Sequence, residues 1–224
     1  MNNKTLKIAT FLDGNFFMTI TEYYKFQHPR QQYLSFSGLT EFIKEEVAKS
    51  EGVDSCYCKI VETHWFRGRY NTSQLNQMMP EEAKRLKWMT NERYRDDLFM
   101  YNGIVQHVYP LQFDHKSGRT VEKGIDVWFA LEAFELAILK KFDIVCLMAG
   151  DTDYVPLVRK LNGLGIRVMV LGWDFSYTLQ DGKVVTTRTS QALLDESSYP
   201  VLMDDIINNP REQEAEIVSG LFGA

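Results

Sequence analysis

Aspartates follow two apolar runs of the chain that have the composition of buried strands. Leu6–Leu12 is followed directly by Asp13, and Asp143–Ala149 is followed two residues later by Asp151. Such runs are typical of parallel strands covered on both faces. Ligands bind at the carboxyl edge of open parallel sheets. If the two strands are neighbours, we expect both aspartates, together with Asp153, to meet at that edge.

A third aspartate, Asp126, lies at the start of a helix expected over Ile125–Lys140. At about 100° per residue, it shares one narrow face of this helix with the alanines at positions 130, 133 and 137. A stripe of alanines is typical of a helix that lies close against a sheet, so we expect Asp126 at the start of the buried face. An uncompensated buried carboxylate is costly and needs a partner. The simpler alternative is that Asp126 stabilises the positive end of its own helix.

Carboxylates gathered at one edge would point to a divalent cation. Several of them within a few ångströms repel one another, and one must hold a proton unless a cation intervenes. Mg²⁺ and Mn²⁺ prefer carboxylate and water oxygens and would relieve this repulsion. Such an ion could orient and activate water against a phosphodiester, and a second could neutralise the leaving oxygen.

Other interpretations of the same residues, including purely structural ones, stay open. Asp13 and Gly14 fit a turn in front of a helix with Asn15 as its N-cap, and Asp153 fits a helix cap. The acidic pocket could also serve a nucleotide or a small phosphorylated ligand.

The composition excludes several classes of protein. The chain has 224 residues, of which 45% are hydrophobic and 25% charged, so it can bury a core and is not disordered or low-complexity throughout. Its apolar runs are shorter than the roughly 18 residues of a spanning helix, and its first residues lack a secretory pattern. Three cysteines are too few for a disulfide framework. We therefore expect a cytoplasmic protein without a membrane partner.

Charge is unevenly distributed along the chain. The net charge of −5 argues mildly against nucleic acid as a partner. Between Lys59 and Arg95, however, eight basic residues stand against four acidic ones, whereas seven acidic residues and only Arg211 follow from Asp195 onward. Local fields matter more to a polyanion than the overall sum does. RNA therefore remains the expected partner of the middle of the chain.

The remaining pattern alternates strands with helices. Further strands are expected over Val53–Thr63 and Ile166–Leu171, and helices over Phe16–Phe26, Leu39–Lys49, Glu81–Tyr101 and Asp153–Leu161. This alternation predicts an α/β fold with a mainly parallel sheet and right-handed crossovers. No long linker divides the chain. We expect one domain over residues 1–205, ending in one or two short helices, and an acidic polar tail over 206–224.

Three ordered blocks of this sequence resemble the NYN domain, a branch of the PIN-like nucleases that includes the LabA-like proteins. Three ordered blocks are far more specific than one short motif. The resemblance covers roughly residues 6–205 and is strongest over 121–172. The blocks are Phe11-Leu12-Asp13-Gly14-Asn15, Lys123-Gly124-Ile125-Asp126-Val127 and Ala149-Gly150-Asp151-Thr152-Asp153-Tyr154-Val155-Pro156-Leu157-Val158.

The resemblance implies a Rossmann-like, three-layer α/β/α domain with metal-dependent ribonuclease activity. It implies that Mg²⁺ or Mn²⁺ is held by Asp13, Asp126 and Asp151, with Asp153 as a fourth acidic member and Asn15 steadying the site. The implied product ends are a 5′-phosphate and a 3′-hydroxyl.

The chain departs from the family pattern at three places. Phe16 replaces the Asn that often follows Asn15, and Thr152 stands where Ser is usual but keeps the hydroxyl. The stretch Trp65–Tyr101 is longer than the minimal family core, and we interpret it as a helical insertion that serves as a substrate grip or a homodimer contact.

Substrate contacts are expected from basic side chains near the acidic motifs. Residues 64–70 interleave aromatics with Arg67 and Arg69 in an expected loop, which suits base stacking and phosphate pairing on single-stranded RNA. The alternative is a surface loop whose aromatics cover the core. Lys123 and Thr152 are further candidates for phosphate contacts. The basic residues between 84 and 95 fit a solvated helix face.

These features together predict an endoribonuclease that acts on single-stranded or loop RNA. The alternative is a non-catalytic RNA-binding or regulatory module that retains the acidic pocket.

Crowding of the carboxylates leads to a first prediction. Asp126→Asn should abolish cleavage and leave the metal-free protein equally or more stable, because it removes one of several mutually repelling charges. RNA cleavage and thermal unfolding in a metal chelator measure the two effects. A large loss of metal-free stability would instead identify Asp126 as a helix-start residue.

Overall fold

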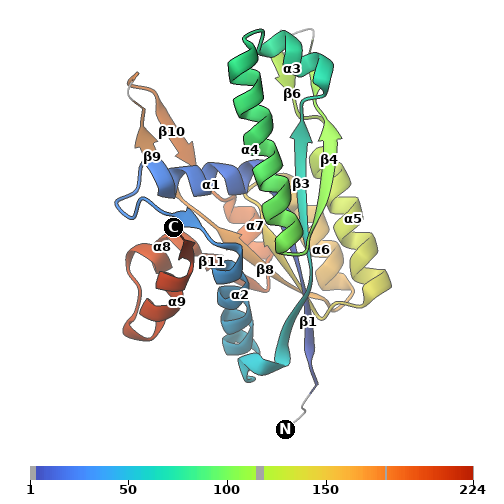
Figure 1. Ribbon diagram of the computed structural model, residues 1–224. Helices are drawn as coiled ribbons and strands as arrows, with labels where there is room; N and C mark the ends of the chain where they lie inside the picture. Colours follow the sequence, from blue (N-terminus) through green and yellow to red (C-terminus); the bar gives the residue numbers. More distant parts are fainter. Residues whose placement is uncertain (1–3, 115–118, 180, 224) are drawn as a thin grey trace.

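A six-stranded, all-parallel sheet forms the centre of the molecule (Figure 1). The computed structural model describes residues 4–114, 119–179 and 181–223. The strand order is β11-β8-β7-β1-β3-β4. These strands are β1 (Leu6–Asp13), β3 (Cys58–Arg69), β4 (Ile104–Pro110), β7 (Ile144–Met148), β8 (Arg167–Gly172) and β11 (Tyr199–Leu202).

The strand order creates a switch point between β1 and β7. The chain first adds β3 and β4 on one side of β1, and then returns to add β7, β8 and β11 on the other side. The connections that leave β1 and β7 therefore diverge, and in open parallel sheets a ligand crevice forms where they do. Asp13 ends β1 and Asp151 follows β7. The expectation that the two strands are neighbours is confirmed.

Helices cover both faces of the sheet, which confirms the three-layer architecture. One face packs against α1 (Gly14–Phe26), α2 (Phe36–Glu51) and α4 (Glu82–Tyr101). The other face packs against α5 (Ile125–Lys140), α6 (Val155–Gly163) and α7 (Gln191–Glu196). Within the described ranges, no helix combines the length and the apolar character needed to cross a membrane.

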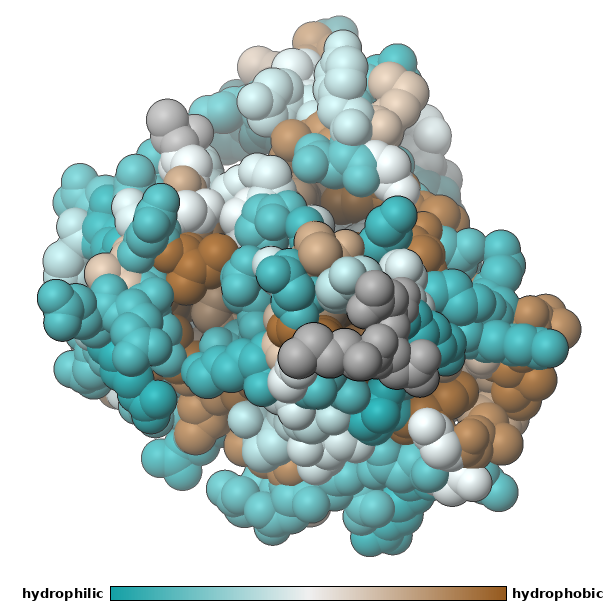
Figure 2. All heavy atoms as spheres, turned by 90° about the horizontal axis from the view of Figure 1, so that it is seen from below, coloured by the Kyte–Doolittle hydropathy of each residue, from teal (hydrophilic) through white to brown (hydrophobic). Residues whose placement is uncertain are grey.

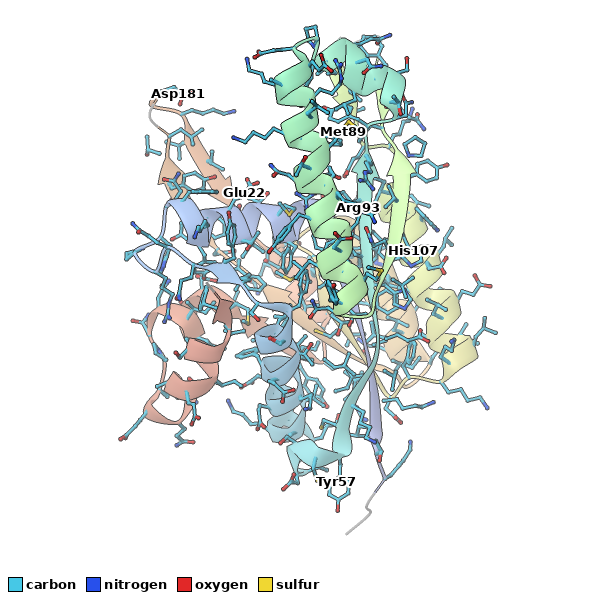
Figure 3. All side chains as sticks on the ribbon, viewed as in Figure 1. Glu22, Tyr57, Met89, Arg93, His107 and Asp181 are labelled. Carbon is cyan, nitrogen blue, oxygen red and sulfur yellow. The ribbon has the colours of Figure 1, made fainter. Side chains whose placement is uncertain are left out.

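Two projections extend beyond the carboxyl edge of the sheet. One consists of the ends of β3 and β4 with α3 (Thr72–Met78), α4 and the pair β5 (Gln112–Asp114) and β6 (Arg119–Val121). The other is the hairpin of β9 (Phe175–Thr178) and β10 (Val184–Thr187). Figure 3 labels Met89 on α4 and Asp181 at the tip of this hairpin.

Strand β3 corrects two expectations. It runs over Cys58–Arg69 rather than Val53–Thr63, so the loop expected over residues 64–70 is wrong. Residues His64, Trp65 and Phe66 are buried, and β3 pairs with β4 up to Arg69. The expected insertion therefore begins as a strand, and α3 and α4 form the crossover from β3 to β4.

The end of the chain is not a detached tail. Helices α8 (Met203–Asn208) and α9 (Ala215–Gly220) bury Ile207 and Val218 in the main core. The short strand β12 (Phe222–Gly223) pairs with β2 (Tyr33–Leu34). The segment is acidic, as expected, but its apolar side chains anchor it to the domain.

Asp143 ties the start of β1 to the start of β7. Its Oδ1 accepts a hydrogen bond from Lys4 Nζ at 2.6 Å, and its Oδ2 accepts one from the Lys7 backbone N–H at 2.9 Å. Burial of the carboxyl opposes ionisation, but these hydrogen bonds and the two lysine charges hold the Asp143 pKa below its ordinary value.

We expect Asp143→Ala to lower the free energy of unfolding at pH 7 by about 1–2 kcal/mol. The depressed pKa stabilises the native state above pH 3.8, the ordinary pKa of the group, and this contribution is lost as the pH falls through the folded-state pKa. The deficit of the variant should therefore shrink in urea titrations below that pH. Glu41→Ala is the control because Glu41 pairs with Lys44 on the exposed surface of α2, and its cost should stay within about 0.5 kcal/mol.

Candidate active site

Asp13 ends β1 and caps the N-terminus of α1. Its Oδ1 accepts hydrogen bonds from the backbone N–H groups of Asn15 at 3.0 Å and Phe16 at 3.1 Å. This satisfies two donors that a helix start leaves unpaired. Burial nevertheless raises the pKa of the Asp13 carboxyl, and the charge of Asp126 adds to this effect. The N-cap is therefore Asp13, and the expectation that Asn15 caps this helix is wrong.

A buried tyrosine joins two of the expected carboxylates. The Tyr154 hydroxyl lies 2.9 Å from Asp126 Oδ1 and 3.2 Å from Asp13 Oδ2. The Tyr154 side chain is only 1% exposed, and burial together with the two carboxylates raises its pKa, so the hydroxyl keeps its proton. One proton can be donated to only one acceptor at a time. Asp13 and Asp126, which are 113 positions apart in the chain, therefore share a single donor.

Asp126 is exposed, which corrects the expectation that it starts the buried face of its helix. The buried stripe of α5 consists of Ile125, Phe129, Ala133 and Ala137. The helix is thus rotated relative to the expected face, because the ring of Phe129 takes the central position against the sheet. The αL conformation of Gly124, with φ of 81°, turns the chain into this helix. Asp126 consequently lies at the rim of the first turn, where it reaches Tyr154.

Glu122 is a third carboxylate of this site that the sequence analysis missed. Its Oε1 accepts the backbone N–H of Gly68 at 2.6 Å, and its Oε2 accepts Asn15 Nδ2 at 2.5 Å. Burial raises the Glu122 pKa, and the charges of Asp13 and Asp126 raise it further. The only sequence signal for this role is its place four residues before Asp126.

The Glu122 contact depends on the local geometry of β3. Strand β1 ends at Asp13, which pairs with Phe66, so Gly68 lies beyond the last residue that β1 can pair with. Glu122 supplies an acceptor at this open edge. A Cβ atom on Gly68 would lie 2.7 Å from Glu122 Cγ, so only glycine permits this approach.

The third family block stands beside this cluster. Asp151, Thr152 and Asp153 are exposed, and Asp151 Oδ1 accepts the Asp153 N–H at 3.1 Å, which caps the short turn η2 (Thr152–Tyr154). Thr152 Oγ1 donates to Ser190 Oγ at 2.8 Å. The cap is thus Asp151 rather than Asp153. Among the described residues, no hydrogen bond links these three side chains to the Asp13–Asp126 pair.

The arginines expected to bind substrate are paired within the protein. Arg67 contacts Glu92 at 3.1 Å, and Arg69 contacts Glu92 at 3.2 Å and Asp96 at 3.1 Å. Glu92 is buried in α4 and also pairs with Arg95. Lys123 is exposed next to the cluster. The basic residues of α4 lie on a helix, as expected, and Lys84 and Arg93 pair with acidic neighbours on it or at its cap.

The oxygen ligands of this cluster suit a hydrated divalent cation that is bound by two carboxylates. As the side chains stand, no group of three or more His, Cys, Asp or Glu in the described ranges is arranged to hold a metal ion. Mg²⁺ is commonly bound through one or two carboxylates together with waters and substrate phosphates. Asp13 and Asp126 meet that requirement because both reach the same hydroxyl.

Comparison with known proteins identifies the family. The model of the NYN domain matches residues 7–197. The chain belongs to the NYN domain family. The LabA-like subgroup stays a prediction. No curated protein matches the sequence.

A solved structure supports the same fold. The crystal structure of a protein of unknown function from Vibrio parahaemolyticus resembles this chain with a TM-score of 0.51 and 18% identity, covering 92% of this chain and 96% of that one. At this identity the likeness concerns the fold alone. The NYN domain fold is of the nuclease type, and the expected Rossmann-like, PIN-like architecture is confirmed.

The shared hydroxyl predicts a pH-dependent effect of Tyr154→Phe. The hydrogen bond from Tyr154 lowers the Asp13 pKa, so its loss should raise that pKa further. A native carboxyl with a raised pKa loses stability as the pH rises through the folded-state value. We expect the metal-free variant to lose about 1–3 kcal/mol at pH 7 and less at pH 5, where a carboxyl proton can replace that of the hydroxyl.

Tyr199→Phe is the matched control for urea unfolding at both pH values. Tyr199 donates to Glu51 at 2.7 Å, and Glu51 keeps its ion pair with Arg167 when the hydroxyl is removed. Its cost should be the same at pH 7 and pH 5. If the loss of unfolding free energy depended on pH equally in both variants, Tyr154 would not be the donor that two carboxylates share.

Proposed function

We propose that this NYN domain is a metal-dependent endoribonuclease that hydrolyses phosphodiester bonds of single-stranded or loop RNA. The observation that carries the proposal is the meeting of Asp13 and Asp126 on one buried hydroxyl, at the switch point of a nuclease-type fold. Glu122 adds a third acidic group next to them. Carboxylates crowded in this way favour a divalent cation over three separate protons.

Each residue of the cluster has a distinct task in this proposal. Asp13 and Asp126 would hold Mg²⁺ or Mn²⁺, with Asp151 approaching from the neighbouring strand end. The ion would neutralise phosphate charge and make a water more acidic. The Tyr154 hydroxyl holds the Asp13 and Asp126 carboxylates close to each other. Glu122 orients the Asn15 amide through the 2.5 Å hydrogen bond.

Substrate binding falls first to Lys123. This side chain is exposed three residues before Asp126, where a phosphate held at the carboxylates would lie within its reach. Arg67 and Arg69 could contact RNA only by giving up their ion pairs with Glu92 and Asp96. Lys123 is therefore the proposed contact to the phosphate. Arg67 and Arg69 are secondary candidates for contacts to the RNA.

One observation favours the non-catalytic RNA-binding module as a second candidate. The two carboxylates that meet are bridged by the Tyr154 hydroxyl, and the described residues contain no assembled set of three ligands. A domain that binds RNA without cleaving it needs no assembled set of metal ligands. Metal binding and cleavage therefore have to be measured separately.

The decisive experiment incubates the purified full chain with unstructured RNA and with a duplex of the same sequence, with and without Mn²⁺. We expect Mn²⁺-dependent cutting of the unstructured RNA that leaves 5′-phosphate ends. Asp126→Asn and Asp151→Asn should each lower the rate at least about a hundredfold, because they remove groups that hold the ion. Calorimetry should show weaker Mn²⁺ binding for the same variants.

Asp181→Asn provides the control carboxylate, because Asp181 lies at the tip of the β9–β10 hairpin, away from the cluster (Figure 3). Its cleavage rate should equal that of the wild type. RNA binding with no product at any Mn²⁺ concentration would establish the non-catalytic module. Cutting that survives Asp126→Asn and Asp151→Asn would refute the assigned site.

A further inference from the structure

The segment that follows β10 returns to the carboxyl edge of the sheet, beside the third family block. The Ser190 backbone N–H donates to the Gly150 carbonyl at 2.8 Å, and the Ser190 hydroxyl accepts the hydrogen bond from Thr152 at 2.8 Å. Thr189 is fixed as well, because its Oγ1 accepts the Trp173 backbone N–H at 2.9 Å. The base of the β9–β10 hairpin is therefore tied to the residues that follow β7 and β8.

Arg188 directly precedes these anchored residues and lies on the same side of the segment as Ser190. Arg188 is exposed, Thr189 is buried and Ser190 is half-buried. This alternation is that of an extended chain, in which residues two positions apart share a side. Two extended residues span at most about 7 Å, and Ser190 contacts Thr152. The long side chain of Arg188 therefore extends over the surface beside Asp151 and Thr152.

Arg188 is free of the ion pairs that engage other arginines of the chain. Arginines that pair with carboxylates include Arg67, Arg69, Arg93, Arg95, Arg159 and Arg167. Within residues 4–114, 119–179 and 181–223, no carboxylate forms an ion pair with Arg188. Asp174, which directly precedes β9, accepts the Thr189 backbone N–H at 2.9 Å instead. The donors of the Arg188 guanidinium are therefore available to an anion from outside the protein.

We propose that Arg188 binds a backbone phosphate of single-stranded RNA at the edge of the acidic cluster. The planar guanidinium presents its donors in a fork that matches two phosphate oxygens, and it stays charged throughout the physiological pH range. A polyanion that approaches several carboxylates is repelled unless cations lie close by. Arg188 supplies such a cation on the side of β7 and β8.

Lys123 supplies a second cation on the opposite side of the cluster. Its neighbour Glu122 accepts the Gly68 N–H, which places this segment at the end of β3. The sheet order sets β1, with Asp13 at its end, between β3 and β7. An RNA strand that contacts both Lys123 and Arg188 therefore crosses the switch point and carries the phosphate between them over the carboxylates.

This inference rests on the proposed function, and its test separates RNA binding from cleavage. Fluorescence anisotropy of an unstructured RNA is measured with the full chain in a metal chelator and in the Asp126→Asn background, which together prevent cutting. Arg188→Gln should weaken binding about tenfold. It should also lower the slope of log affinity against log salt by about 0.7, the value for one phosphate contact on a single strand. Arg188→Lys should keep that slope, because it keeps the charge.

Arg188→Gln with unchanged RNA affinity would overturn the inference, and Mn²⁺-dependent cutting by the wild type would still support the nuclease. A full chain that binds no RNA in this assay would overturn the inference as well. Loss of cutting in the wild type would instead count against the proposed function alone.

A double variant tests whether the RNA crosses the switch point. If Lys123 and Arg188 hold different phosphates, the free-energy losses of Lys123→Gln and Arg188→Gln should add. The salt slope should then fall by about 1.4, twice the value for one contact. A double variant that binds no more weakly than either single variant would overturn the proposed path.

Arg211→Gln is the matched control because it removes the same charge at a distant place. Arg211 is exposed, its backbone N–H donates to Glu214 at 3.1 Å, and Glu214 pairs with Lys49 in the last turn of α2. That end of α2 leads to the start of β3, at the amino edge of the sheet. Figure 2, seen from below, shows a largely hydrophilic surface at the left, the side on which α8 and α9 lie in Figure 1.

The control should change neither the RNA affinity nor the salt slope. If Arg211→Gln weakened binding as much as Arg188→Gln, the affinity would depend on overall charge rather than on a contact at residue 188, and the inference would be overturned.

Discussion

Repulsion between carboxylates is the constraint around which the candidate site is built. Asp13 comes from the end of β1, and Glu122 and Asp126 come from the segment that begins α5. Bringing the three carboxylates together costs free energy unless each charge has a compensating donor. The N-terminus of α1 compensates Asp13, the β3 backbone and Asn15 compensate Glu122, and the single proton of Tyr154 lies between Asp13 and Asp126. Burial raises the pKa values of Asp13 and Glu122, and the charges of the neighbouring carboxylates raise them further.

The sheet topology determines which residues lie close enough to compensate these carboxylate charges. Because the chain returns from β4 to the opposite side of β1, the ends of β1 and β7 are neighbours with no crossover lying over both. The same return leads the chain past the edge of β3 just before α5 begins, which brings Glu122 to Gly68. The overhang of β3 beyond β1 is therefore a structural part of the site. At its charged end, Arg67 and Arg69 form ion pairs with Glu92 on the crossover helix α4.

Sequence patterns predicted those parts of this arrangement that depend on local residues. Buried strands with aspartates at their ends are local features, and they were sufficient for the α/β class and for the placement of β1 beside β7. Glu122 and Tyr154 were missed because their roles arise only from contacts between segments distant in the sequence. The last half of β3 was interpreted as a loop because arginines alternate there with aromatics. The ion pairs with Glu92 and Asp96 of α4 compensate the charges of these arginines in the paired strand. The C-terminal segment was likewise predicted to be a polar tail because acidic residues dominate its composition. Its few apolar residues, such as Val218, nevertheless anchor it to the core.

Helix α5 connects the candidate site to the core of the domain. Its inner stripe fixes the helix against the sheet, and its first turn carries Asp126 at the rim of the cluster. That stripe contains Phe129, whose ring packs against Phe11 of β1 and against Tyr154. The aromatic core beneath the first turn of α5 therefore positions both the Tyr154 hydroxyl and the Asp126 carboxylate that it contacts. The place of Asp126 in the acidic cluster is a consequence of how this one helix packs against the sheet.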